Sequence, residues 1–318
     1  MLKNLFIFNS KFPKAFVFCL CLLIILEASI YVFFIENNPD IKELDKLLHR
    51  NSKNVDYIFL GSSRIRSNIN EETLKKYRNL EFVNFGFGGA ASVPLYFILN
   101  RFLNNNPDMK IRHCILGLDK QHLVDIYSTR FREGYLTRVL TFSEFREIKG
   151  YLPENSKKIY YLSKIIPSYR IPDSFLVYTV YKNRVYKYPG FETRMNLYND
   201  ITSEHLAFKD PLELNMKYTE KIIEFCLSND IHIQLLINPL PQSIYEEHLL
   251  LNPHAFQKMD NFINHLCKKY QVELIQLPRV LPDDKFQDPS HRKDPTHLNR
   301  KGAIYYTELL IEKIIQDK

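Results

Sequence analysis

Short apolar runs alternate with amphipathic stretches over two parts of the chain, residues 55–119 and 211–315. Apolar runs bounded by turn residues predict buried strands of a parallel sheet, and apolar positions three and four apart predict helices. The predicted strands are 55–60, 81–84, 111–118, 231–237 and 272–277, and the predicted helices are 71–77, 94–103, 211–229, 252–270 and 300–315. This alternation predicts an α/β fold, a flavodoxin-like three-layer sandwich with about five parallel strands.

The alternation stops between about residues 121 and 210, where Tyr, Arg and Lys are frequent and no strand pattern is visible. This segment is too long for a bare loop in a compact domain, so we expect a helical insertion at the carboxyl edge of the sheet. It is either a lid over a site at that edge or a peripheral helical patch with a solvated basic face. Tyr and Arg suit sugar or anion binding, but they also suit ordinary packing.

The strongest apolar signal is near the amino terminus, where residues 15–35 are apolar apart from Glu27 and small polar residues. This length matches the hydrocarbon core of a bilayer, and a charge such as Glu27 costs about 2.5–3.5 kcal/mol there, which the flanking Leu, Ile and Phe can offset. Lysines precede the run and acidic residues follow it, which predicts a single-pass transmembrane helix with a cytoplasmic amino terminus. A cleaved signal peptide and a buried helix of a soluble core are the alternatives.

The anchor divides the chain into a tail and transmembrane helix (1–36), a polar, partly helical spacer (37–54) and an α/β domain (55–318). The domain would then be extracytoplasmic (periplasmic), held at the inner or cytoplasmic membrane. The net charge of +7 permits acidic glycans or membrane surfaces as partners, and no basic run indicates nucleic acid. Only three of the five cysteines lie outside the apolar run, so no disulfide scaffold is expected.

A pair of serines follows the first predicted strand, in the sequence Gly61-Ser62-Ser63-Arg64. Glycine permits a sharp turn at the carboxyl end of the strand, and that edge binds ligands in open α/β sheets. Ser63, on a tight turn ahead of a helix, is therefore a candidate nucleophile. A plain turn or helix cap is the alternative.

Asp294 and His297, just before the last predicted helix, are the candidate partners of this serine. The carboxylate would orient the imidazole, and the imidazole would exchange a proton with the serine hydroxyl. A helix-capping loop is the alternative. A second pair, Asp288 and His291, lies six residues earlier, but the combined spacing matches no standard metal signature, so we expect no metal.

Four segments resemble the four sequence blocks of the SGNH (GDSL-like) hydrolases: Gly61-Ser-Ser63, Asn84-x-Gly86-x-x-Gly89, Gly117-x-Asp119 and Asp294-x-x-His297. The resemblance covers about residues 55–315 outside the insertion. It implies that Ser63 is the nucleophile, His297 the base and Asp294 the orienting acid. It also implies that the backbone amides of Ser63 and Gly89 belong to the oxyanion hole. As in the family, Leu-Asn-x-x-Gly302 follows the Asp294 block and not the Asp288 pair.

The chain departs from the family pattern at two positions. Ser62 stands where the family usually has Asp, and Asp119 stands where it has an Asn that donates to the oxyanion. A carboxylate at Asp119 would repel the developing negative charge unless it were protonated or turned away. Asn238, after the fourth predicted strand, is the candidate replacement donor, and Arg64 has no assigned role.

These departures favour a divergent, membrane-anchored branch that resembles bacterial polysaccharide O-acetyltransferases and D-alanyl-transfer proteins. The resemblance implies an esterase or O-acyltransferase that acts on a cell-envelope or exopolysaccharide glycan through an acyl-Ser63 intermediate. It also implies a multi-span membrane partner that delivers acyl groups. The second hypothesis is a degenerate SGNH fold that binds polysaccharide or an assembly partner without chemistry.

A dinucleotide fingerprint, Gly86-x-Gly88-x-x-Ala91, is the remaining alternative for the second block. It follows the second predicted strand rather than the first, and no acidic residue ends a strand about twenty residues later. We therefore expect no cofactor.

Overall fold

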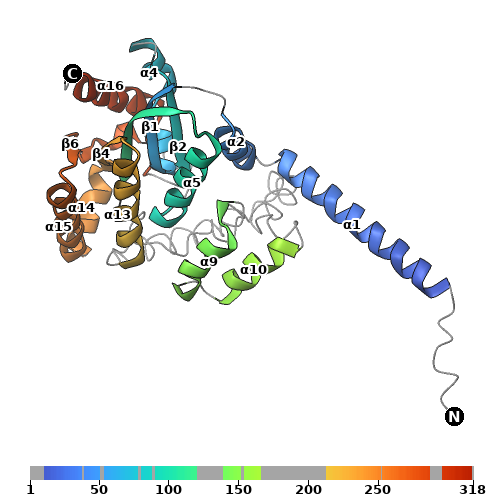
Figure 1. Cartoon of the computed structure of the whole chain (residues 1–318). Helices are drawn as coiled ribbons and strands as arrows, with labels where there is room; N and C mark the ends of the chain where they lie inside the picture. Colours follow the sequence, from blue (N-terminus) through green and yellow to red (C-terminus); the bar gives the residue numbers. More distant parts are fainter. Residues whose placement is uncertain are drawn as a thin grey trace, which may run out of the picture.

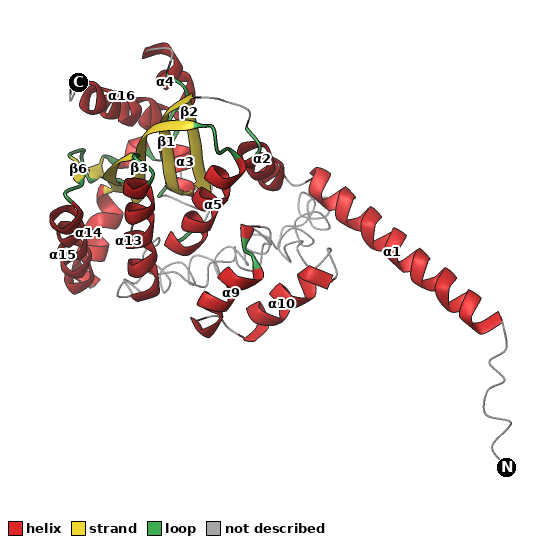
Figure 2. Ribbon diagram, viewed as in Figure 1, coloured by secondary structure: helices red, strands yellow, loops and turns green. Residues whose placement is uncertain are grey.

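The computed structural model describes residues 11–37, 39–50, 54–77, 80–87, 90–119, 139–151, 154–165, 213–251, 253–286 and 296–316. Its central sheet consists of β1 (Asn54–Ser62), β2 (Phe82–Phe87), β3 (Lys110–Leu118), β4 (His232–Ile237) and β6 (Glu273–Ile275). These five strands are parallel and lie in the order β2-β1-β3-β4-β6, with helices on both faces (Figure 2). Counted along the chain this is the flavodoxin order, so the predicted parallel α/β sheet is confirmed.

Two hydrophobic cores lie on opposite faces of the sheet, because alternate side chains of a strand point in opposite directions. Ile58 and Leu60 of β1 pack on one face, while Tyr57 and Phe59 pack on the other. The first face is covered by α2 (Pro39–Leu48), α5 (Ser92–Asn105), α13 (Glu213–Ser228) and α15 (Pro253–Tyr270), and the second by α3 (Ser63–Asn68), α4 (Glu71–Tyr77) and α16 (Arg300–Gln316). Figure 1 shows this arrangement.

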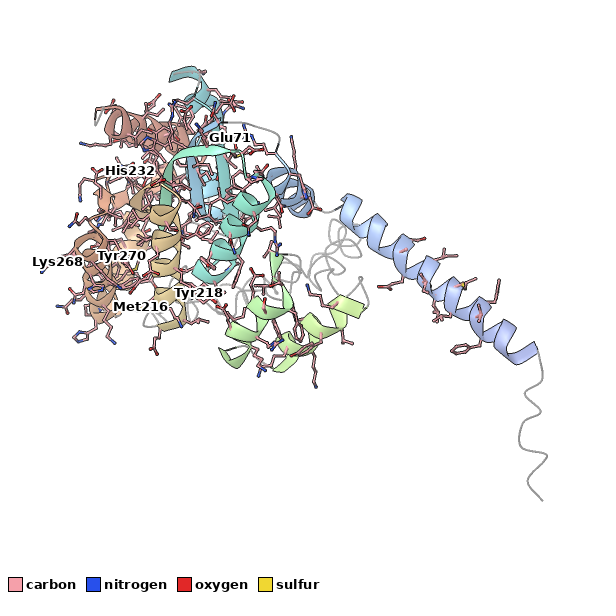
Figure 3. The ribbon with its side chains drawn as sticks, in the orientation of Figure 1. Glu71, Met216, Tyr218, His232, Lys268 and Tyr270 are labelled. Atoms are coloured by element: carbon pink, nitrogen blue, oxygen red, sulfur yellow. The ribbon has the colours of Figure 1, made fainter. Side chains whose placement is uncertain are left out.

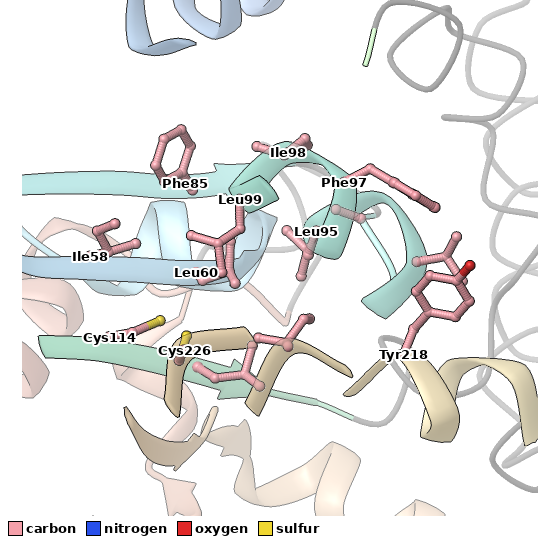
Figure 4. Close-up of a cluster of buried hydrophobic side chains, with 14 of the residues drawn as sticks. Ile58, Leu60, Phe85, Leu95, Phe97, Ile98, Leu99, Cys114, Tyr218 and Cys226 are labelled. Carbon is pink, nitrogen blue, oxygen red and sulfur yellow. The ribbon is translucent and has the colours of Figure 1, made fainter. Parts of the chain in front are cut away.

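Cys114 of β3 and Cys226 of α13 lie close together in the first core (Figure 4). Both are fully buried. Their mutual hydrogen bond and burial raise the pKa of the Cys114 thiol well above its ordinary value. These cysteines therefore serve as small buried residues of the core.

Two elements differ from the sequence prediction. No helix was predicted between Ser63 and Asn68, but these residues form α3, whose Ile65 is fully buried. A helix that was not predicted, α14 (Gln242–Leu251), precedes α15. A small parallel sheet of β5 (Leu240–Pro241) and β7 (Val280–Leu281) lies beside it, followed by the 3₁₀ turn η3 (Asp283–Lys285).

The described part of the insertion is helical and consists of α9 (Phe142–Ile148), the 3₁₀ turn η1 (Lys149–Tyr151) and α10 (Glu154–Ile165). Phe145 and Tyr160 stack with ring centroids 3.7 Å apart. The insertion contacts α13, where Lys221 Nζ lies 3.0 Å from a Glu147 carboxylate oxygen and Tyr218 donates to the same carboxylate at 3.4 Å. Figure 3 labels Tyr218 on α13. The rest of the segment lies outside the described residues, so the choice between lid and peripheral patch stays open.

The amino-terminal helix α1 (Lys11–Asn37) projects away from the α/β domain (Figure 1). Counting only the residues for which the structure is described, no helix is both long enough and apolar enough to cross a bilayer. The transmembrane anchor therefore stays a prediction from the sequence.

Gly86 allows α3 to lie directly against β2. A Cβ atom on Gly86 would sit 2.3 Å from Arg66 N and 2.6 Å from Arg66 Cα, so the whole helix would have to shift. We expect Gly86→Ala to destabilise the fold by about 1–3 kcal/mol, the usual cost of overpacking. Gly150→Ala is the matched control, because its Cβ would meet nothing within 4 Å. Thermal unfolding of the two variants should give a lower midpoint for Gly86→Ala; equal midpoints would contradict the close approach.

Candidate active site

Ser63 is the first residue of α3, directly after the carboxyl end of β1. The preceding Ser62 caps this helix by accepting a hydrogen bond on Oγ from Arg64 N at 3.2 Å. The turn is tight because Gly61 lacks a side chain: a Cβ there would lie 2.4 Å from Ile65 Cγ1. Ser63 is half-buried and stands at the carboxyl edge of the sheet.

His297 lies just before α16, in a segment that neighbouring residues hold in place. The Asn299 side chain donates to the carbonyls of Asp284 at 2.7 Å and Phe286 at 2.8 Å, and it accepts from Gly302 N at 2.9 Å. Residues 298 and 286 also form an antiparallel bridge. These contacts explain the Leu-Asn-x-x-Gly302 sequence that follows the histidine.

Helix α16 is in turn attached to the serine helix α3. Thr307 Oγ1 accepts from Asn70 N at 2.8 Å and donates to the carbonyl of Asn68 at 3.2 Å. Thr307 and Asn68 are completely buried. These bonds attach the end of α3 to the middle of α16 on the same face of the sheet.

Ser63 Oγ and His297 Nε2 lie 2.7 Å apart, although 234 residues separate them in the sequence. This distance is within the hydrogen-bond range over which a histidine accepts a serine proton. Asp294 and Gly89 lie outside the described residues. The orienting acid and the second oxyanion amide therefore stay predictions.

Asp119, at the carboxyl end of β3, forms a hydrogen bond with the side chain of Ser62. Its Oδ2 accepts a hydrogen bond from Ser62 Oγ at 2.5 Å, and both side chains are buried. Such short bonds are typical of a hydroxyl that donates to a carboxylate. The two departures from the family pattern, at Ser62 and Asp119, thus contact each other.

Asn238, directly after β4, has a buried side-chain donor without a partner. Its Oδ1 accepts from Asn68 Nδ2 at 3.1 Å, which leaves its own Nδ2 as the free donor, and this atom has no hydrogen bond. The neighbouring Ile237 carbonyl accepts from the Tyr306 hydroxyl at 3.2 Å, and burial raises the pKa of that phenol. Because an unpaired buried donor costs about 1–3 kcal/mol, Nδ2 is suited to a substrate oxygen.

A cavity of about 320 Å³ opens at this edge of the sheet. Arg64, Asp119 and Asn238 provide polar groups, and side chains of α14 and α15, including Tyr245 and Phe256, provide apolar wall. A mostly apolar cavity with a few polar groups is typical of small-molecule sites. The sequence analysis did not predict that residues of α14 line this cavity. The helix-forming residues that follow Pro241 could have indicated this helix.

The alternative metal site is only partly described. Of the residues considered as ligands, His297 is described and contacts Ser63, while Asp288, His291 and Asp294 are not. In the portion of the chain that the structure describes, no group of three or more His, Cys, Asp or Glu residues is placed to hold a metal ion.

No protein-family model and no curated protein sequence matches this chain. Among solved structures, a Streptococcus pneumonia protein provisionally named a platelet activating factor is similar, with 14% identity and a TM-score of 0.42 over 93% of this chain and 98% of that chain. A Bacteroides fragilis protein provisionally named an acylhydrolase has 11% identity and a TM-score of 0.37, over 87% of this chain and 92% of that chain. With TM-scores this low, neither similarity identifies the protein, and the site rests on its own geometry.

Proposed function

We propose that this protein is a serine esterase or O-acyltransferase of the SGNH type. The observation that carries the proposal is the 2.7 Å contact between Ser63 Oγ and His297 Nε2 at the carboxyl edge of the sheet. A serine used only as a turn residue has no need of an imidazole at this distance. The unpaired Asn238 donor adds the kind of group that an oxyanion hole requires.

In the proposed reaction, Ser63 Oγ attacks the acyl carbonyl carbon while His297 Nε2 takes the hydroxyl proton. The carbonyl oxygen becomes an oxyanion and accepts hydrogen bonds from the Ser63 backbone amide and Asn238 Nδ2. The tetrahedral intermediate then collapses, and His297 returns the proton to the leaving alcohol. Water releases the acyl group from Ser63 in an esterase, and a sugar hydroxyl accepts it in a transferase.

The substrate that we propose is an acylated glycan of the cell envelope or an exopolysaccharide. The resemblance of the four sequence blocks to polysaccharide-modifying SGNH proteins supports it, and so does the predicted anchor. A transferase outside the cytoplasm needs acyl groups from across the membrane, so we also propose a multi-span membrane partner that delivers them.

The anchor itself is proposed from the apolar run at residues 15–35. On α1, the described large apolar side chains between Phe16 and Leu26 are all at least 47% exposed to solvent. A continuous apolar surface of this kind favours burial in an apolar phase. The orientation follows from the lysines that precede the run.

We expect alkaline phosphatase fused after residue 40 to be active, and green fluorescent protein fused at the same position to show no fluorescence. Alkaline phosphatase folds in the periplasm and green fluorescent protein in the cytoplasm, so fusing each to the same position distinguishes the two locations. Fluorescence without phosphatase activity would contradict the proposed orientation and the envelope substrate.

The nucleophile is tested with a fluorophosphonate, which forms a covalent adduct with an activated serine. We expect one adduct on the full-length protein, detected by intact mass spectrometry and lost in Ser63→Ala. Ser62→Ala is the matched control, since it removes the neighbouring hydroxyl and keeps the hydroxyl of Ser63. A folded protein that takes up no label, or that loses it only in Ser62→Ala, would contradict the proposal and favour the binding module.

A further inference from the structure

Arg64 is a buried cation for which the described residues provide no partner. Only 3% of the residue is exposed, and its Nε makes no hydrogen bond. Among the described residues no ion pair or side-chain hydrogen bond of its guanidinium group is present. A charge removed from water is costly unless it is paired, so this arrangement calls for an opposite charge.

The other charged groups on the cavity wall are already engaged. Arg279 Nη1 and Asp260 Oδ1 form an ion pair at 2.7 Å, at the more exposed end of the wall. Asp119 accepts from Ser62 at 2.5 Å. Within the described wall, Arg64 is therefore the charged side chain that has neither a hydrogen bond nor an ion pair.

Arg64 also lies where it can contact a substrate. It is the neighbour of Ser63 in α3, and it lines the cavity of about 320 Å³ together with Asn238. The Ser62 cap holds the Arg64 backbone at the first turn of α3. A bound anion would accept hydrogen bonds from the guanidinium. Because the folded protein already keeps water away from this group, binding would not have to remove its hydration.

We propose that the cavity is a substrate subsite in which Arg64 binds an acidic group, a carboxylate or phosphate, next to the ester on which Ser63 acts. This rests on the proposed function and narrows it: the substrate is an ester that carries a negative charge, with an apolar part against Tyr245 and Phe256. The acidic group belongs either to the acyl part or to the alcohol part, such as an acidic sugar.

Matched ester pairs test the subsite in the full-length protein. In the first pair, mono-p-nitrophenyl adipate carries a negative charge on the acyl part, and its methyl ester is neutral. In the second pair, 4-acetoxybenzoate carries the charge on the alcohol part, and its methyl ester is again neutral. We expect the wild type to prefer the acidic ester in at least one pair. That preference, as a ratio of kcat/KM values, should fall about 10- to 100-fold in Arg64→Gln, the usual effect of losing a charged hydrogen bond.

Arg112→Gln is the matched control, because it removes the same charge at the opposite edge of the sheet, where Arg112 pairs with Asp56 at 2.9 Å. Its preference should stay within about threefold of the wild type, as expected for an exposed charge. An acid-to-neutral ratio that is unchanged in Arg64→Gln for both pairs would overturn the subsite. If the wild-type protein turned over none of the four esters, the proposed function itself would be overturned.

A binding measurement keeps the inference testable if Arg64→Gln does not fold. Adipate should raise the midpoint of thermal unfolding of the Ser63→Ala protein, because a ligand that binds the folded state stabilises it. Hexane-1,6-diol, which has the same chain length without charge, should not. Equal shifts with the two compounds would overturn the subsite whether or not the enzyme turns over esters.

Discussion

Replacing Ser63 with alanine is expected to lower the turnover of p-nitrophenyl acetate by about 10³-fold or more, the usual loss when a member of a catalytic triad is removed. The physical reason is that Ser63 Oγ lies 2.7 Å from His297 Nε2, which can take its proton as the oxygen attacks. The measurement is the release of p-nitrophenolate by the full-length protein in detergent, with folding checked by circular dichroism.

His297→Ala should cause a loss of the same size, because serine and histidine act in one proton transfer. The double variant Ser63→Ala/His297→Ala should then be no slower than either single variant, since residues that act as a unit are not additive. Equal turnover in the wild type and both single variants would leave Ser63 as a turn residue. In that case the polysaccharide-binding module would be the better hypothesis.

Replacing Asn238 with alanine should lower kcat by about 10²–10³-fold with little change in KM, the usual effect of removing one oxyanion donor. Its Nδ2 is buried and has no partner in the resting protein. It therefore becomes bonded only when a substrate oxygen arrives, and the bond is strongest when that oxygen carries the negative charge.

Asn68→Ala is the matched control for Asn238→Ala. It breaks the same 3.1 Å hydrogen bond between the two side chains but leaves the Asn238 donor in place. We expect kcat to fall by less than about tenfold in this variant, in the range of one neutral hydrogen bond. Equal losses in the two variants would show that Asn238 acts by supporting the fold and not as an oxyanion donor.

The sequence was sufficient for the central sheet. Its strands are buried on both faces, so they are continuous apolar runs such as Ile111–Leu118, and the prediction falls within one residue of β3. The same holds for the helix α4, Glu71–Tyr77, which was predicted with the observed bounds. Local pattern is enough here because burial of apolar side chains, which the sequence displays directly, dominates these elements.

Local pattern failed where burial depends on distant parts of the chain. Residues 65–70 are mixed in polarity, and only the approach of α16 and the contact between Thr307 and Asn68 make a short buried helix favourable there. Helix α14 was missed because it directly precedes α15 and has no clear apolar spacing of its own. Its packing depends on the small β5–β7 sheet, whose paired residues Leu240 and Val280 are 40 residues apart along the chain.

For the site, the sequence by itself supplied the residue types: a serine after the first strand, a histidine before the last helix and an Asn after the fourth strand. Only the tertiary structure decided which groups meet: it places His297 against Ser63, pairs Asp119 with Ser62, and leaves Asn238 Nδ2 and Arg64 Nε without partners. The reason is physical. Hydrogen bonding and desolvation depend on distances across the sheet edge, and spacing along the chain does not contain those distances.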